Sequence, residues 1–239
     1  MDLIARLRRV VRSLGFDVVR YDPRTHPFAR LMRLLEHHGI DLIFDVGANT
    51  GQYGEEMRTL GYTGRLVSFE PLSAAFVQLQ QRAAADPQWD TFNLALGATK
   101  DTATIHVAQN LQSSSLLEML PAHVHAAPDS AYIAEEKIRV DTLQAMVGAY
   151  RRPGERLLVK ADTQGFERQV VEGAGDALGD IVGFQLELSL VPLYKDGPLA
   201  ADMIRLMDNL GFTLMGLEPA YSDGDTGQLL QVDGLFFRT

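Results

Sequence analysis

The feature that most constrains the fold is an alternation of short apolar runs with segments of helical periodicity. The apolar runs have the length of buried strands: Leu42–Val46, Leu66–Phe69, Thr91–Leu96, Arg156–Ala161 and Val182–Leu188. Between most of them apolar residues recur at helical spacing, as in Gln52–Leu60, Ala74–Ala85 and Phe166–Gly173. Buried strands that alternate with helices indicate a parallel sheet with helices packed on its faces.

The last part of the chain departs from this alternation. After Leu188 come a proline-containing loop, a helical segment at Ala200–Leu210, and two strand-like runs, Phe212–Leu217 and Gly234–Arg238. Such an ending predicts an antiparallel hairpin added to a mostly parallel sheet. A chain of 239 residues suits one large α/β domain. We therefore expect one domain over residues 41–239, preceded by a helical extension over residues 1–40.

Composition excludes several classes of protein. The chain has no cysteine, which rules out disulfides, thiolate zinc sites and a cysteine nucleophile, and which fits a cytoplasmic location. A net charge of −9 argues against nucleic acid as a partner. No apolar stretch approaches the roughly 18 residues that a membrane span needs. Arginines interrupt the N-terminal apolar residues, so we expect no secretory signal.

The first 33 residues are rich in arginine and allow two interpretations. Apolar residues recur there at helical spacing beside the arginines: Leu3, Ile4, Leu7, Val10, Val11 and Leu14. This basic helix would either lie on an anionic membrane surface or a partner, or pack on its own domain or across a homodimer. The second interpretation is the simpler one. A separate polar segment, Gln109–Lys137, contains Ser113–Ser115 and two histidines, and we predict that it covers the substrate as a lid.

The most informative stretch runs from Ile43 to Gly54, where a predicted strand enters a glycine-punctuated turn and then a helix. Gly47 and Gly51 allow a tight turn and close approach to a ligand. Glu70 ends the next strand, where its carboxylate can accept hydrogen bonds from ribose hydroxyls. Dinucleotide-binding enzymes share these features, but Asp45 would repel a pyrophosphate and attract the ammonium or sulfonium of a methionine derivative. The Gly-x-x-x-Gly spacing also differs from that of the dinucleotide turn.

Together with motifs further along, this stretch resembles the FkbM family of methyltransferases. The resemblance is carried by Asp45–Gly51, Phe69–Pro71, Lys160–Glu167 with Gly173-Ala174 behind it, and the closing Asp233–Phe236. It implies a Rossmann-like class I methyltransferase with a mostly parallel seven-stranded sheet, helices on both faces and an antiparallel C-terminal hairpin. It also implies S-adenosylmethionine as cofactor and O-methylation of sugars or other natural-product hydroxyls.

The resemblance also implies contacts with the cofactor. These are Asp45, Gly47, Ala48, Asn49 and Gly51 around the methionyl part, Glu70 and Pro71 at the ribose, Leu96 near the adenine, and Ser114 and Ser115 over the cofactor. For the two serines, a flexible polar loop is an equally good interpretation.

The acceptor should bind beside Asp162, which directly follows a predicted strand and so lies where ligands gather in open α/β sheets. Asp162 is our first candidate for the base that takes the hydroxyl proton, followed by His125 and then His123 in the lid, whose imidazoles titrate in a useful range. Lys160 is expected to alternate away from Asp162 and to act in packing or as an ion-pair partner. Asp162 and Glu187 end neighbouring predicted strands, and together they would hold either Mg²⁺ or sugar hydroxyls without metal.

The sequence thus predicts an O-methyltransferase that acts on a hydroxyl of a sugar, oligosaccharide or glycolipid. The alternatives are methylation of a non-sugar natural product, such as a polyketide or an acid, and a nicotinamide-dependent dehydrogenase, which Asp45 disfavours. Methylation of nucleic acid is disfavoured by the acidic charge and by the lack of an Asn/Asp-Pro-Pro-aromatic motif for a flipped base.

Overall fold

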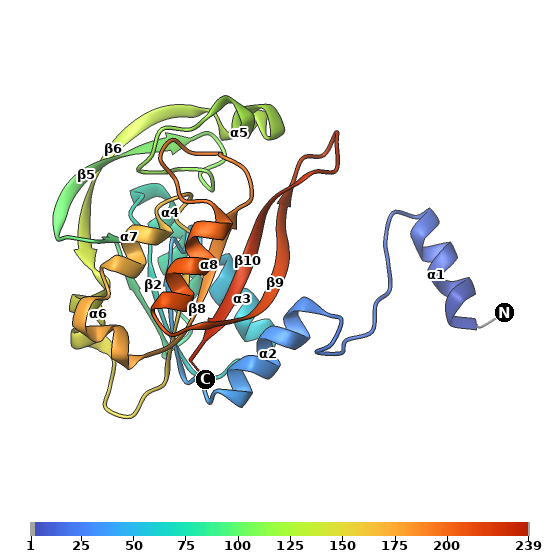
Figure 1. Cartoon of the computed structure of the whole chain (residues 1–239), viewed down its shortest axis with the longest axis horizontal. Helices are drawn as coiled ribbons and strands as arrows, with labels where there is room; N and C mark the ends of the chain where they lie inside the picture. Colours follow the sequence, from blue (N-terminus) through green and yellow to red (C-terminus); the bar gives the residue numbers. More distant parts are fainter. Residues whose placement is uncertain (1–2, 239) are drawn as a thin grey trace. The chain divides into compact units, whose positions relative to one another are not determined.

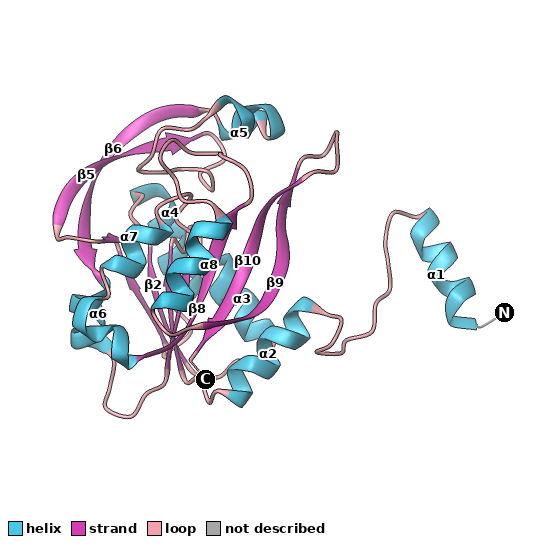
Figure 2. Cartoon of the chain, viewed as in Figure 1, coloured by secondary structure: helices cyan, strands magenta, loops and turns pink. Residues whose placement is uncertain are grey.

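The structure is a computed structural model that describes residues 3–238, with the side chains of residues 3–7 left aside. It divides into two units, residues 1–37 and residues 38–239. The first unit contains α1 (Leu3–Ser13) and α2 (Pro27–His37). The second contains all the strands and the remaining helices (Figure 1, Figure 2). None of the described helices combines the length and the apolarity that a bilayer crossing requires.

The second unit is built on a seven-stranded sheet with the order β3-β2-β1-β7-β8-β10-β9. The strands are β1 (Leu42–Val46), β2 (Arg65–Phe69), β3 (Trp89–Phe92), β7 (Leu157–Ala161), β8 (Ile181–Ser189), β9 (Thr213–Ser222) and β10 (Leu229–Phe237). The first five strands in that order run parallel, and β10 is antiparallel to both β8 and β9. The predicted α/β fold with an antiparallel C-terminal hairpin is confirmed.

Strand alternation divides the sheet into two chemically different faces. One face is apolar: residues such as Phe44, Val159 and Leu186 pack in a single core with α6 (Leu143–Tyr150), α7 (Glu167–Glu172) and α8 (Ala200–Asn209). On the opposite face, α3 (Gln52–Thr59) bonds to the sheet through the hydroxyl of Tyr53, which donates to Gln185 on β8. Helix α4 (Ser73–Ala83) connects β2 to β3. This second face is apolar where the strands begin, at Ile43, Leu66 and Leu158, and its polar residues lie nearer the carboxyl ends of the strands.

A second sheet of three strands corrects one expectation. Its order is β4-β6-β5, with β4 (Ala95–Gly97), β5 (Asp101–Ala108) and β6 (Tyr132–Thr142). The run Thr91–Leu96, predicted as one strand, is divided between β3 and β4, which belong to different sheets. The chain turns between them at Asn93, whose side-chain amide donates to the carbonyl oxygens of Glu70 and Pro71.

The predicted lid, residues 109–137, is more regular than its polar sequence suggested. It contains α5 (Pro121–Ala126) and the 3₁₀ turn η1 (Pro128–Ser130), and its last residues are the start of β6, which pairs with β5. A further 3₁₀ segment, η2 (Gly175–Asp180), precedes β8. Residues 109–137 therefore extend from the second sheet, while their role as a lid stays a prediction.

Candidate active site

The carboxyl ends of β1 and β7 meet at a loop that glycine alone can form. Gly47 and Gly51 have φ angles of 76° and 92°, in the left-handed region that favours glycine. The amide of Asp162 donates to the carbonyl of Val46 at 3.1 Å, which draws the two strand ends together. A Cβ atom on Gly47 would overlap the carbonyl oxygen of Asp162. This corner is therefore fixed by backbone contact before any ligand binds.

Glu70 joins this corner to the end of β2. Its carboxylate accepts hydrogen bonds from the amides of Asn49 at 2.8 Å and Leu72 at 2.7 Å, and it is almost fully buried. Burial raises its pKa to about 7, although the two amides oppose this. A carboxylate has about four acceptor positions, so two remain for ribose hydroxyls. Ala48 is buried and Pro71 half-buried beside it.

A row of polar side chains crosses the centre of the sheet on the face opposite the apolar core. The strand register places Asp45 of β1 beside Ser68 of β2 and Lys160 of β7, and Lys160 beside Gln185 of β8. Ser68 donates to Asp45 at 3.2 Å, and the ammonium of Lys160 lies 3.1 Å from the Asp45 carboxylate. The side chains of this row are thus linked to one another by hydrogen bonds and an ion pair in the protein interior.

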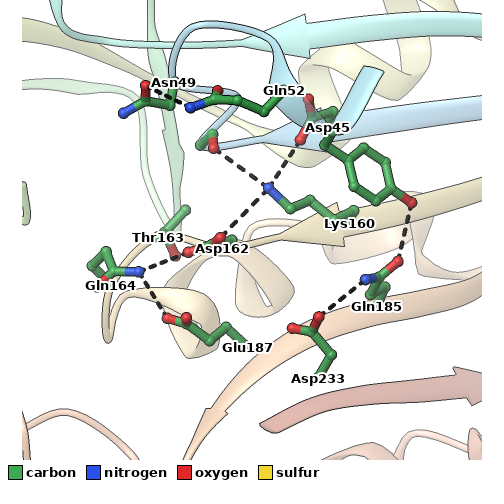
Figure 3. Close-up of polar contacts among 12 residues, drawn as sticks. Asp45, Asn49, Gln52, Lys160, Asp162, Thr163, Gln164, Gln185, Glu187 and Asp233 are labelled. Carbon is green, nitrogen blue, oxygen red and sulfur yellow. Dashed lines mark hydrogen bonds and ion pairs between the residues drawn. The ribbon is translucent and has the colours of Figure 1, made fainter. Parts of the chain in front are cut away.

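Lys160 is the centre of this row (Figure 3). Besides Asp45, its ammonium lies 3.4 Å from the carbonyl of Gly47, 3.8 Å from the carboxylate of Asp162 and 5.3 Å from the ring centre of Tyr53. Burial opposes the charged form, but the charges of Asp45 and Asp162 outweigh it and raise the pKa of Lys160 above its ordinary value. Lys160 therefore carries its charge between the two predicted halves of the site.

These contacts correct two expectations. Lys160 does not point away from Asp162, because residues two apart in a strand share a face; its predicted role as an ion-pair partner is confirmed. Asp45 is fully buried and already paired, so it does not present an uncompensated charge to a ligand. The electrostatic argument against a pyrophosphate is weaker than the sequence suggested, and the contact of Asp45 with a cofactor stays a prediction.

On the acceptor side, Gln164 connects the two predicted carboxylates. Its side-chain nitrogen donates to Asp162 at 2.8 Å and to Glu187 at 2.9 Å (Figure 3). Its side-chain oxygen accepts from the hydroxyl of Tyr194 at 2.5 Å. Asp162 is the more accessible carboxylate, with 40% of its side chain exposed. Burial, followed by the charges of Asp162 and Glu167, raises the pKa of Glu187. Gln164 is not among the predicted site residues, although it lies within the Lys160–Glu167 motif.

Asp233 is a third carboxylate that sequence reasoning did not assign to the site. It lies opposite Glu187 in the antiparallel pairing of β10 with β8. The side-chain nitrogen of Gln185 lies 3.5 Å from its carboxylate, while the oxygen of Gln185 accepts from Tyr53 at 3.0 Å. Burial, and then the charge of Asp162, raises the pKa of Asp233 to about 6. No other candidate site residue lies close to Asp233 in the sequence, so only the strand register shows that Asp233 and Glu187 are neighbours.

Glu167 holds the loop that follows β7. One of its oxygens accepts from the amide of Thr163 at 2.8 Å, the hydroxyl of Thr163 at 3.0 Å and the amide of Gly165 at 3.2 Å. Burial raises the pKa of Glu167 to about 7. These hydrogen bonds fix the loop that carries Gln164, so Glu167 positions the site residues by holding their loop.

The two candidate histidines lie apart from the carboxylates. His123 is buried in α5, with ring centres 5.1 Å from Tyr194 and 5.8 Å from Tyr221, and burial lowers its pKa. His125 is exposed on the same short helix. Within the described residues neither imidazole has a hydrogen bond to Asp162. His123 reaches it only through Tyr194 and then Gln164, so the structure does not join the histidines to the predicted base.

The lid serines and Leu96 have structural contacts of their own. Ser114 accepts from the amide of Ala108 at 2.9 Å, and Ser115 donates to the carbonyl of Gln164 at 2.7 Å. Ser115 thereby ties the lid to the loop after β7. The side chain of Leu96 is buried in the main core, which leaves its backbone as the part able to face an adenine. Cofactor contacts by all three residues stay predictions.

The expected metal site is incomplete. Across residues 3–238, no group of three or more His, Asp or Glu side chains converges as a set of metal ligands. Asp162 and Glu187 supply two carboxylates, and the nitrogen of Gln164 is bonded to both of them. Mg²⁺ prefers a nearly octahedral shell of oxygens. The residues present therefore do not form a magnesium site by themselves.

Comparison with known proteins identifies the family. Residues 45–214 match the model of the methyltransferase FkbM domain, which is more than half of the chain. The chain belongs to the FkbM methyltransferase family. The family implies S-adenosylmethionine as methyl donor, and the corner fits that donor: Gly47 and Gly51 place no side chain at two positions of the loop, and Glu70 keeps acceptor positions free.

Several solved structures are similar to this FkbM methyltransferase at low sequence identity. A TehB-like SAM-dependent methyltransferase from Corynebacterium glutamicum is 12% identical, with 98% of this chain and 96% of that chain covered and a TM-score of 0.43. An rRNA methylase from Streptococcus thermophilus is 9% identical (90% and 97% covered, TM-score 0.47). Precorrin-6y C5,15-methyltransferase from Geobacter metallireducens is also 9% identical (90% and 90% covered, TM-score 0.46). No curated protein matches the sequence.

Proposed function

We propose that this methyltransferase transfers a methyl group from S-adenosylmethionine to a hydroxyl oxygen of a sugar, oligosaccharide or glycolipid. The observation that carries the proposal is the polar rim of Asp162, Gln164 and Glu187, which lies beside the glycine corner and is held by shared hydrogen bonds. The carboxylates of the rim can accept hydrogen bonds from several neighbouring hydroxyls. Such a rim suits an acceptor with several hydroxyls better than an apolar one.

One set of residues binds the donor, and another positions the carboxylate that faces the acceptor. Gly47, Gly51 and Glu70 hold the donor at the ends of β1 and β2, and S-adenosylmethionine supplies a methyl group on a positively charged sulfur. Lys160 keeps Asp162 in place from beneath, at 3.8 Å. Positioning of the two reactants supplies a large share of the rate, up to about 7–11 kcal/mol in favourable cases.

We assign the proton to Asp162, the most accessible carboxylate of the rim. As the methyl–sulfur bond breaks and the carbon–oxygen bond forms, the acceptor hydroxyl passes its proton to this carboxylate. Gln164 donates to both Asp162 and Glu187 and so keeps the second carboxylate near the first. General-base assistance of this kind contributes about 10²–10⁴-fold. The products are adenosylhomocysteine and a methyl ether.

Labelled S-adenosylmethionine and a panel of neutral sugars, glycolipids, polyketide alcohols and carboxylic acids would test the substrate class, with the label located by mass spectrometry. We expect methyl ethers on the sugars or glycolipids. Transfer to the polyketides or acids alone would refute the sugar assignment and leave the methyltransferase intact. The same assay with a chelator, and then with Mg²⁺ added back, tests the sequence-based metal prediction.

Asp162→Asn tests the assignment of the base. We expect the variant to bind adenosylhomocysteine as the wild type does, measured by thermal shift, and to lose about 10²–10⁴-fold in turnover. Asp176→Asn, an exposed residue of η2, is the matched control and should keep full activity. Unchanged turnover in Asp162→Asn would remove Asp162 from the mechanism.

The cysteine-free sequence also leads us to propose that the enzyme acts in the cytoplasm.

A further inference from the structure

Exposed apolar side chains gather in a short segment that the active site does not use. Large hydrophobic residues that are exposed within the described part of the chain include six between residues 10 and 21: Val10, Leu14, Phe16, Val18, Val19 and Tyr21, with exposed fractions of 47–72%. We refer to residues 8–21 as the N-terminal segment. Soluble proteins rarely expose apolar residues in such a contiguous group unless it binds something.

The N-terminal segment is held in shape by its own polar contacts. After α1 the chain reverses at Gly15, which has a φ of 84°, and the amide of Phe16 donates to the carbonyl of Val11 at 3.2 Å. Arg8 donates to the carbonyl of Val18 at 2.8 Å, and Arg12 pairs with Asp17 at 2.8 Å. The polar groups are thus used to fold the segment, while the apolar side chains are left outside.

The charge of the N-terminal segment is opposite to that of the whole chain. It carries Arg8, Arg9, Arg12 and Arg20 against the single acid Asp17, whereas the chain has a net charge of −9. Apolar and aromatic side chains interleaved with arginines match a bilayer, whose anionic headgroups attract the arginines and whose acyl boundary receives the apolar groups.

A second copy of the chain fits the N-terminal segment less well than a bilayer. Two such segments would repel each other, since both are basic. The acidic remainder would satisfy the charge, but the exposed large apolar residues described there lie singly on different elements: Phe28 on α2, Val77 on α4, Val124 on α5, Ile133 on β6, Leu190 after β8 and Leu217 on β9. They offer no comparable apolar surface to cover the segment.

We propose that residues 8–21 dock the enzyme on an anionic phospholipid surface. Arginines near such a surface strengthen binding by about fivefold each, and this attraction weakens with salt. Phe16 and Val19 insert among the lipids and give the part of the binding that resists salt. The docking surface is independent of the methyl-transfer chemistry, so either proposal can fail without the other.

Vesicle sedimentation with the full-length protein tests the proposal. We expect binding to vesicles of phosphatidylcholine with phosphatidylglycerol, and weak binding to phosphatidylcholine alone. Arg9→Gln with Arg20→Gln should weaken binding about 25-fold, and Phe16→Gln with Val19→Gln should abolish what remains at high salt. The control is Val77→Gln with Ile133→Gln, two equally exposed apolar residues elsewhere, which should bind as the wild type does.

Two results would overturn the docking proposal. One is equal binding of the wild type and the Phe16/Val19 variant to the anionic vesicles, or no binding by either. The other is a wild-type dimer in light scattering that the Phe16/Val19 variant converts to a monomer, which would assign the segment to self-association. Unchanged thermal stabilisation by adenosylhomocysteine would show that each variant is folded.

Discussion

Replacing Lys160 by methionine removes a buried ammonium while keeping the length of the side chain. The ammonium lies 3.1 Å from Asp45, which is fully buried, and 3.8 Å from Asp162, which is 40% exposed. In Lys160→Met the Asp45 carboxylate keeps its hydrogen bond from Ser68 and loses its counter-charge. Removing one partner of a buried ion pair costs about 3–5 kcal/mol of unfolding free energy.

The reciprocal variant should cost less. In Asp45→Asn the ammonium of Lys160 keeps Asp162 as a counter-charge and the carbonyl of Gly47 as an acceptor, so we expect a loss of about 1–3 kcal/mol. The double variant has no buried charge at this point in the row. Because replacing both partners is often nearly neutral, it should be more stable than Lys160→Met alone.

Urea denaturation of the four proteins near neutral pH gives the coupling between the two residues. We expect a coupling free energy of about 2–3 kcal/mol, the upper range for residues in contact. The slopes of the denaturation curves should stay equal, which keeps the comparison valid. A loss below about 1 kcal/mol in Lys160→Met, or strictly additive losses, would show that the ion pair is not formed in the folded protein and refute the reasoning.

Two further predictions concern the glycine corner and Glu70. Gly47→Ala should lose about 2–4 kcal/mol of unfolding free energy, because its φ is strained and its Cβ overlaps Asp162. The control Gly61→Ala, with a φ of 92° and open space around it, should lose about 1 kcal/mol. Equal losses in urea denaturation would contradict the close approach of Gly47 to Asp162. Burial raises the pKa of Glu70 from 4.5 to about 7, so the folded state keeps a proton that the unfolded state releases in this range, and stability should fall as the pH rises. The raised pKa of Glu70 contributes at most about 3 kcal/mol to the unfolding free energy. Glu70→Gln should reduce the loss of unfolding free energy measured between about pH 5 and pH 7.5. An equal loss in the variant and the wild type would contradict the raised pKa of Glu70.

Local sequence patterns determined the fold class and the glycine corner where we propose that the donor binds. A buried strand needs only a run of apolar residues, and a tight turn needs only glycine at the right position, so β1, the Gly47 corner and Glu70 at the end of β2 could be read from neighbours in the chain. The same is true of the hairpin formed by β9 and β10. The motifs that resemble the FkbM family also depend on residues close together in sequence, and the family match over residues 45–214 agrees with them.

The tertiary structure alone decided which side chains meet. The register of β1 with β7 pairs Asp45 with Lys160, and the antiparallel register of β10 with β8 places Asp233 beside Glu187. Apolar runs specify that strands exist, but not which residue of one strand lies opposite which residue of another. The burial of His123 likewise depends on distant aromatic rings. Charge pairing across strands depends on non-local contacts, and for that physical reason the sequence alone does not predict that Lys160 neutralises the charge of Asp45.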